Sequence, residues 1–183
     1  MKLIAAILAS VLVAIVLSAL PSAPAQMPSG RDVVAPTAFA SLEPVGRGSA
    51  FQLAVVLKIR EGFHINARHP SADYLIPTDL KIELPAGFQA GETSYPKGEL
   101  RKFTFSKTPL NVYEDKVVIR MMLNALPDAP LGAQRLPLKL RYQACSTEAC
   151  LPPVTLPVDA TVNVAANATG SQPVHPELFP PQH

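Results

Sequence analysis

The chain has 183 residues, of which 48% are hydrophobic and 16% are charged, and its net charge is +2. This length suits one domain of ordinary size, and the near-balance of charge without a basic stripe argues against nucleic acid as a partner. The 20 prolines disfavour long helices and favour short strands and turns.

The sequence pattern of residues 1–25 predicts a segment that is not part of the folded domain. One Lys is followed by an apolar run of 18 residues from Leu3 to Leu20, and then by Pro and small residues. The Ala-Pro-Ala tripeptide at 23–25 fits a small-x-small cleavage site, so we predict a signal peptide that is cleaved before Gln26. The alternative is an uncleaved anchor, because this run is at the lower limit for a membrane span.

The remaining chain divides into three predicted parts. Residues 26–45 are rich in Pro and Gly and have one apolar patch, which indicates a lead-in segment with one edge strand. Residues 46–165 carry the pattern of a folded domain. Residues 166–183 are polar and Pro-rich without periodicity, which predicts a disordered tail.

Five stretches of the predicted domain alternate apolar and polar residues with a period of two, which is typical of strands with one buried face. They are Ala50–Arg60, Thr78–Pro85, Lys116–Leu123, Arg135–Gln143 and Val154–Val164. Pro137 predicts that its strand lies at a sheet edge or begins there. Helical periodicity is not evident after residue 25, so the pattern predicts an all-β antiparallel sandwich.

The chain has two cysteines, Cys145 and Cys150, and four residues separate them. One follows a predicted strand and the other opens the next, so they should face each other across a tight bend. Cross-strand Cα distances of about 4.5–5.5 Å fall within the disulfide range of about 4.4–6.8 Å. A ring of six residues would stabilise the fold by only about 2 kcal/mol. This small gain favours a redox pair, and a structural staple remains the alternative.

Other chemistries fit these cysteines less well. Their spacing differs from Cys-x-x-Cys at a helix start, which excludes a thioredoxin-type site. A zinc site would need His64 or His69 as further ligands, and nothing in the spacing asks for one. Met121 and Met122 suggest copper, but Met121 has the parity of a core residue. We therefore expect neither a metal nor a cofactor.

The segment YQACSTEACLPPVTLPV resembles the active-site hairpin of the N-terminal periplasmic domain of DsbD, the thiol:disulfide interchange protein. The matching residues are Tyr142, Gln143, Cys145, Cys150, Pro152 and Pro153. The stretches GFHINARHPSADYLIPTDLKIELPAG and NVYEDKVVIRMML resemble further parts of the same family. The resemblance covers roughly residues 45–165.

The resemblance implies an immunoglobulin-like sandwich in the periplasm. It implies a monomeric carrier that takes electrons from a membrane-embedded thiol reductase on a separate chain. The carrier would hand them to periplasmic thioredoxin-like or disulfide isomerase proteins, in the type of electron transfer that serves cytochrome c biogenesis. Cys150 would form the mixed disulfide with partners, and Cys145 would resolve it. The competing hypothesis is a non-enzymatic binding module whose disulfide is structural.

The family shields its cysteines with an aromatic cap loop. Tyr95, which precedes a proline in a predicted loop, is our candidate for the cap. Phe103 and Phe105 are further candidates for the cap, but we expect them to be ordinary strand aromatics of the core. The remaining candidates for neighbours of the site are His64, Asn66 and Tyr142.

Overall fold

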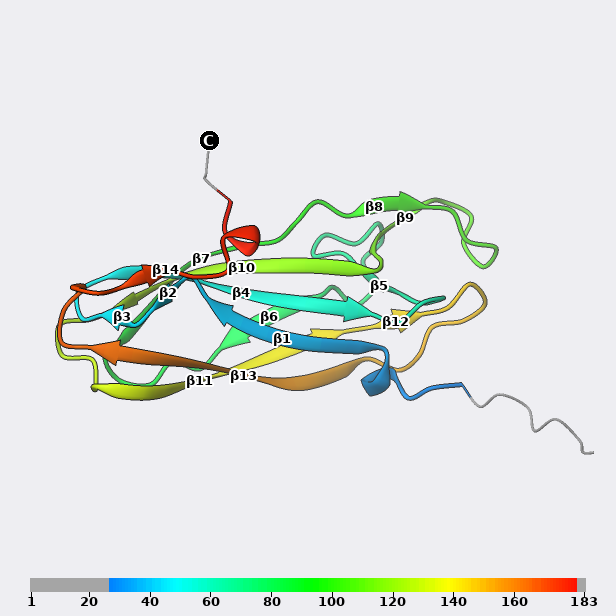
Figure 1. Cartoon of the computed structure of the whole chain (residues 1–183). Coiled ribbons are helices and arrows are strands. Elements are labelled where there is room, and N and C mark those ends of the chain that lie inside the picture. Colours follow the sequence, from blue (N-terminus) through cyan, green and yellow to red (C-terminus); the bar gives the residue numbers. More distant parts are fainter. Residues whose placement is uncertain (1–26, 181–183) are drawn as a thin grey trace, which may run out of the picture.

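The computed structural model describes residues 27–180, and almost all of their regular structure is β-strand. Two four-stranded sheets pack face to face (Figure 1). The first has the order β1 (Val34–Ala40), β4 (Ala50–Ile59), β10 (Lys116–Ala125) and β7 (Phe88–Ser94). The second has the order β3 (Val45–Gly46), β13 (Val154–Ala165), β11 (Gly132–Tyr142) and β6 (Asp79–Ile82). The predicted all-β, immunoglobulin-like antiparallel sandwich is confirmed.

A third sheet lies at one end of the sandwich (Figure 1). Its order is β12 (Ala144–Cys145), β5 (His64–Asn66), β9 (Leu110–Tyr113) and β8 (Glu99–Arg101). A small two-stranded sheet pairs β2 (Leu42–Glu43) with β14 (Gln172–Pro173). The short 3-10 helices are η1 (Gly30–Asp32) and η2 (Pro176–Leu178).

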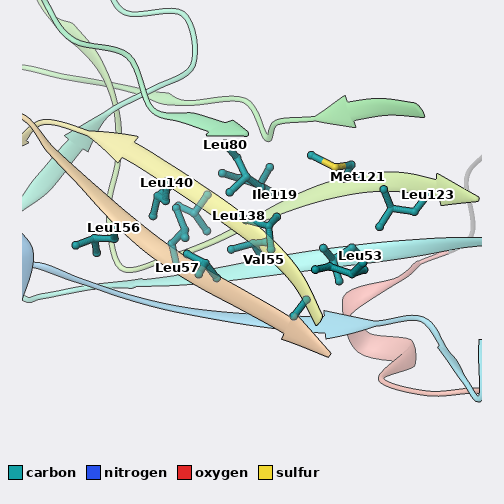
Figure 2. Close-up of a cluster of buried hydrophobic side chains, with 14 of the residues drawn as sticks. Leu53, Val55, Leu57, Leu80, Ile119, Met121, Leu123, Leu138, Leu140 and Leu156 are labelled. Atoms are coloured by element: carbon teal, nitrogen blue, oxygen red, sulfur yellow. The ribbon is translucent and has the colours of Figure 1, made fainter. Parts of the chain in front are cut away.

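The sandwich core comes from the alternation that the sequence predicted. In β4 and β10, the residues on one parity are buried and directly opposed, with Val55 opposite Ile119 and Leu53 opposite Met121. These side chains point toward those of β11 and β13 (Figure 2). Because an antiparallel pair sends alternate side chains to one face, the apolar parity of each strand becomes one wall of a shared core. Met121 is thus a core residue, as its parity predicted.

The predicted edge position of the strand around Pro137 is wrong. This strand, β11, is interior, because it pairs with β13 along its whole length and with β6 from Leu138 to Arg141. Pro137 lies just before the part that β6 covers, and its carbonyl accepts a hydrogen bond from the Glu83 amide at 3.0 Å. The missing N–H of the proline therefore falls where the ladder with β6 has not yet begun.

The folded region is larger than the predicted 46–165 in both directions. The edge strand predicted within the lead-in is β1, which pairs with β4 along its whole length. The predicted disorder of the tail differs from the structure, which places β14 and η2 there. Leu178 is buried against Ala54 and Val56 on the outer face of β4. That face of β4 is apolar too, so it needs a cover that period-two analysis of the strand did not anticipate.

The predicted signal peptide and its cleavage before Gln26 lie outside the described residues. Among residues 27–180, the helices are all too short to cross a membrane.

Candidate functional site

The cysteine hairpin, residues 144–151, begins in the third sheet. Its first strand, β12, runs antiparallel to β5, with Cys145 opposite His64. The chain then turns back through a bend that the Ser146 amide closes by donating to the Ala149 carbonyl at 2.8 Å. The Leu151 amide donates to the Ala144 carbonyl at 2.8 Å. These two bonds flank the cysteines and hold them face to face.

The two cysteines form a disulfide, as their placement across the bend predicted. Their Cα atoms are 3.9 Å apart, which is closer than the spacing that we expected from sequence. The pair lies between two hydrogen-bonded pairs of the hairpin, and such a non-hydrogen-bonded pair is the narrower kind, at about 4.5 Å in regular sheets. The tight bend brings the cysteines slightly nearer still.

The two ends of the disulfide differ in their exposure to solvent. Cys145 is 0% exposed, whereas Cys150 lies on the surface. Thiol–disulfide exchange begins when a thiolate attacks one sulfur of the bond, and the attacked sulfur must be accessible. Cys150 is therefore the accessible end of the disulfide, and Cys145 is the end that lies in the protein interior.

The loop between β8 and β9, residues 102–109, covers this hairpin, and we refer to it as the cap loop. The Phe103 ring stacks on His64 with centroids 4.0 Å apart, and Phe105 continues the stack at 5.4 Å from Phe103. Thr104 Oγ1 donates to the Thr147 carbonyl at the tip of the hairpin at 3.1 Å. The loop and the hairpin thus lie at the same end of the molecule (Figure 1).

Phe103 and Phe105 differ from their predicted role as strand aromatics, since both lie in the cap loop. Phe103 packs on a small cluster that includes Leu110 and Val112, away from the main core. Phe105 is 40% exposed. The prediction was wrong because the segment KFTF places its two aromatics two residues apart. This is the spacing of neighbouring residues on one face of a strand, and here it occurs in a loop.

His64 on β5 is directly opposite Cys145 on β12. It is 2% exposed, and its Nε2 atom has no hydrogen-bond partner among the described residues. Burial lowers the pKa of His64 to about 4, so the imidazole is neutral near pH 7. A buried imidazole with an unpartnered nitrogen thus lies opposite the buried cysteine.

Asn66 and Gln143 tie the hairpin to the loop that follows β5. Asn66 is 0% exposed, and its Nδ2 atom donates to the Ile76 carbonyl at 3.0 Å. Gln143 accepts from the Ile76 amide at 3.4 Å and donates to the Leu151 carbonyl at 3.3 Å. Sequence analysis noticed Gln143 only as part of the motif, and the structure shows it bracing the second strand of the hairpin.

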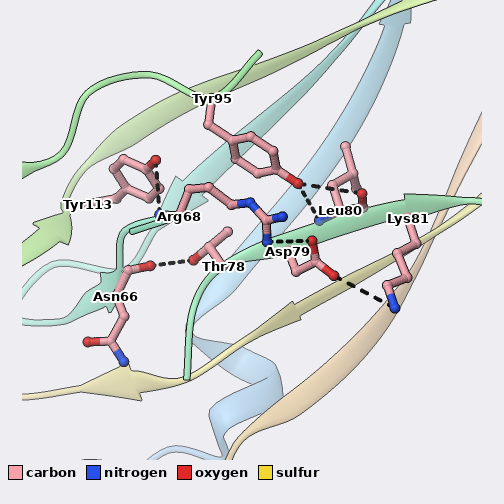
Figure 3. A network of polar contacts seen from close by, with 8 residues as sticks. All are labelled: Asn66, Arg68, Thr78, Asp79, Leu80, Lys81, Tyr95 and Tyr113. Carbon is pink, nitrogen blue, oxygen red and sulfur yellow. Dashed lines mark hydrogen bonds and ion pairs between the residues drawn. The ribbon is translucent and has the colours of Figure 1, made fainter. Parts of the chain in front are cut away.

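Tyr95 makes its contacts at β6 and not in the cap loop. Its hydroxyl accepts a hydrogen bond from the Leu80 amide at 2.8 Å, and the Arg68 guanidinium lies 5.0 Å from its ring centroid (Figure 3). Arg68 is in turn paired with Asp79 at 2.8 Å. Burial is the main cause that raises the pKa of the Tyr95 hydroxyl. This network anchors β6, and the cap assignment passes from Tyr95 to Phe103 and Phe105.

Tyr142 also has a structural contact. Its buried hydroxyl donates to the Gly30 carbonyl at 2.7 Å and so fastens η1 to the second sheet. Burial raises the pKa of Tyr142 to about 12. Within residues 27–180, His, Cys, Asp and Glu side chains do not gather in groups of three or more that could hold a metal ion.

The fold and this site define a β-sandwich domain of the thiol–disulfide exchange class. The chain belongs to the family described as thiol:disulfide interchange protein DsbD, N-terminal, whose model matches residues 31–161. The resemblance inferred from the sequence is thereby confirmed.

Two solved structures are similar to this chain, and both are N-terminal domains. The DsbD N-terminal domain of Neisseria meningitidis, in the reduced form, is 21% identical over 80% of this chain and 94% of that chain, with a TM-score of 0.44. The N-terminal periplasmic domain of ScsB from Proteus mirabilis is 13% identical over 75% of this chain and 49% of that chain, with a TM-score of 0.49. No curated protein matches the sequence.

Proposed function

We propose that this domain carries electrons between thiol–disulfide proteins of the periplasm. Its donor is a membrane-embedded thiol reductase on a separate chain, and its acceptors are thioredoxin-like or disulfide isomerase proteins. Membership of the DsbD N-terminal family supports this role. The observation that carries the proposal is the disulfide itself, which has one surface sulfur and one buried sulfur.

The two half-reactions use the cysteines in different roles. A donor thiolate attacks Cys150, the bond to Cys145 breaks, and its electron pair leaves on the Cys145 sulfur. The donor's second thiol then displaces Cys150, which leaves two thiols in the domain and a disulfide in the donor. In the second half, Cys150 attacks the acceptor's disulfide, and Cys145 attacks Cys150 to release the reduced acceptor. Two electrons and two protons cross in each half.

The hairpin supports this cycle because its shape does not depend on the disulfide. Backbone bonds between Ser146 and Ala149 and between Leu151 and Ala144 close it on either side of the cysteines. Ser146 Oγ also accepts from the amides of Glu148 and Ala149 at 3.2 Å each. A six-residue ring contributes only about 2 kcal/mol to stability, so the bond can open while the domain stays folded.

The cap loop would control access to the cysteine pair. Phe103 and Phe105 stack beside the cysteine strand, and one hydrogen bond from Thr104 holds the loop to the hairpin tip. Cys150 is already exposed, and a partner that displaces this single contact would widen the access to the pair from the side of His64 and Cys145. His64 and Asn66 complete the surroundings of the site from β5.

Trapping experiments test the two cysteine roles. The acceptor is a thioredoxin-like protein whose single active-site cysteine carries nitrothiobenzoate. Reduced Cys145→Ser should attack it through Cys150 and accumulate a mixed disulfide, because the resolving thiol is gone. The matched Cys150→Ser variant should accumulate little, since its remaining thiol is buried. If neither variant captures the acceptor, or if Cys150→Ser captures it better, the proposed roles are wrong.

A redox titration separates this function from that of a binding module with a structural disulfide. Inert structural bridges have potentials below about −300 mV, and exchange proteins lie higher, between about −270 and −120 mV. We expect the Cys145–Cys150 pair to fall in the higher range. A potential below about −300 mV, in the range of structural bridges, would favour the binding module.

A further inference from the structure

One polar atom beside the disulfide has no partner in the oxidised domain. Nε2 of His64 is buried and makes no hydrogen bond within the described part of the chain. A buried polar atom without a partner costs free energy, so native proteins keep few of them. The other ring contacts of His64 are stacking contacts with the cap loop, at 4.0 Å from Phe103 and 6.4 Å from Phe105. These contacts fix the ring and leave the nitrogen unpaired.

The strand register places this ring next to one particular sulfur. His64 on β5 is directly opposite Cys145 on β12. Side chains of directly opposed residues lie on the same face of a sheet, with Cβ atoms about 4.5–5.5 Å apart. Cys145 is the fully buried cysteine, so water cannot take up its proton or stabilise its thiolate. The buried sulfur thus belongs to the residue directly opposite a ring whose buried Nε2 atom has no partner among the described residues.

We propose that His64 is the proton acceptor for the Cys145 thiol in the step that releases a bound partner. This inference rests on the proposed exchange function. In that step the Cys145 thiol gives its proton to His64, and the thiolate attacks the Cys150 sulfur. The bond between Cys150 and the partner breaks, and its electron pair leaves on the partner's sulfur. That thiolate then takes up the proton from the imidazolium or from solvent.

The low pKa of His64 belongs to the oxidised domain, in which Cys145 has no thiol to give up a proton. With the disulfide closed, burial is the cause of the low pKa, and no opposite charge offsets it. A thiolate across the strand would favour the imidazolium, and the imidazolium would favour the thiolate. Charged and titratable groups on the surrounding elements are Lys102 and Lys107 on the cap loop, Glu148 on the hairpin, Arg101 on β8, and Tyr113 and Glu114 at the end of β9. Glu114 is held by Arg101 at 2.9 Å.

The test follows the closing of the disulfide by its pH dependence. Reduced domain is mixed with the disulfide of nitrothiobenzoate. The first coloured thiolate reports attack by Cys150, and the second reports closure by Cys145. The variant His64→Phe keeps an aromatic ring for the stack and removes both nitrogens. The control His69→Gln removes an exposed histidine that follows the same strand.

In the wild type, the second release should have its pH midpoint below the value of about 8.5 for a free cysteine. His64→Phe should move the midpoint up by about one unit and slow closure about tenfold near neutral pH. His69→Gln should follow the wild type. Identical profiles for the wild type and His64→Phe would overturn the inference and leave the exchange function standing. A wild-type domain that never releases the second thiolate would overturn both.

A measurement on the unaltered protein avoids any folding defect of the variant. Nuclear magnetic resonance titration of the His64 ring gives its pKa in both redox states. We expect a value of about 4 with the disulfide closed. The value should rise by at least about one unit when the disulfide is open, because a Cys145 thiolate then favours the imidazolium. An equal pKa in the two states would contradict the role of proton acceptor.

Discussion

The body of the sandwich and its hairpin end bury different kinds of side chain. The facing strands of the body bury apolar residues such as Leu53, Ile119 and Leu140. The hairpin end buries His64 and Asn66, and each keeps one polar atom without a partner among residues 27–180. The body therefore holds the chain together, and the hairpin end buries polar side chains at some cost in stability.

The two regions also differ in how firmly their strands are paired. In the body, β11 (11 residues) pairs with β13 along its full length. At the hairpin end, β12 (2 residues) pairs with β5 at two positions. Because short ladders with few buried apolar contacts open at lower free energy, local opening should begin at the hairpin end. The following predictions test whether stability and chemistry are separated in this way.

The largest effect should come from a cavity in the body. Leu140 is fully buried and lies between its register partners Leu80 and Leu156. Leu140→Ala should lower the free energy of unfolding by about 2–5 kcal/mol, because it removes apolar contacts and leaves a cavity. Urea unfolding measures the loss, and Leu100→Ala, at an exposed position, should change it by less than about 0.5 kcal/mol. The rate at which a dithiol reduces the folded variant should match the wild type.

The next effect is the acid sensitivity of the hairpin end. Burial lowers the pKa of His64 from 6.5 to about 4, so between these values the unfolded chain binds a proton that the folded domain does not. This contribution to stability is complete above about pH 6.5 and is lost as the pH falls toward 4, by at most about 3 kcal/mol. His64→Phe should remove this part of the dependence of the unfolding free energy on pH, and His69→Gln should keep it. Unfolding free energies across this range measure the slope, and parallel curves for His64→Phe and the wild type would contradict the prediction.

A smaller loss of stability is expected when the disulfide is removed. Replacing both Cys145 and Cys150 by Ala should lower the free energy of unfolding by about 2 kcal/mol or less. The backbone bonds on either side of the pair are unchanged, so the circular dichroism spectrum and the cooperative transition should remain. Collapse of the folded state in this variant would show that the bond is a structural staple.

Sequence analysis predicted the body of the molecule far better than its hairpin end. Alternation identified the four longest strands, β4, β10, β11 and β13, and also the short β6, because one face of each is buried and the period of the side chains is two. It did not identify β7. It placed the strand of Pro137 at an edge, since the neighbour of a strand depends on residues far along the chain. The cysteine pair could be predicted because only four residues separate its members.

The wrong aromatic residue was favoured for the cap for a different reason. Phe103 meets His64 only because β5, β9 and β8 pair in one sheet, and this pairing is not encoded in either segment alone. Tyr95 had the local features of a cap residue, because it lies in a loop before a proline. Its contacts with Leu80 and Arg68 could not be predicted from the sequence either. Sequence analysis could therefore predict a motif within one bend, but it could not predict contacts between loops that are far apart in the chain.

The smallest effect on stability, and the sharpest test of the comparison, concerns the cap. Phe105 is partly exposed, so Phe105→Ala should change the free energy of unfolding by less than about 0.5 kcal/mol. Reduction of the disulfide by dithiothreitol should nevertheless become a few-fold faster, because access to the bond limits exchange. Tyr95→Ala should do the opposite: it removes the hydrogen bond to Leu80 and the contact with Arg68, and so lowers stability without changing the rate. If Tyr95→Ala speeds reduction and Phe105→Ala does not, the ring that shields the cysteines is Tyr95, and the cap loop belongs with the structural body of the domain.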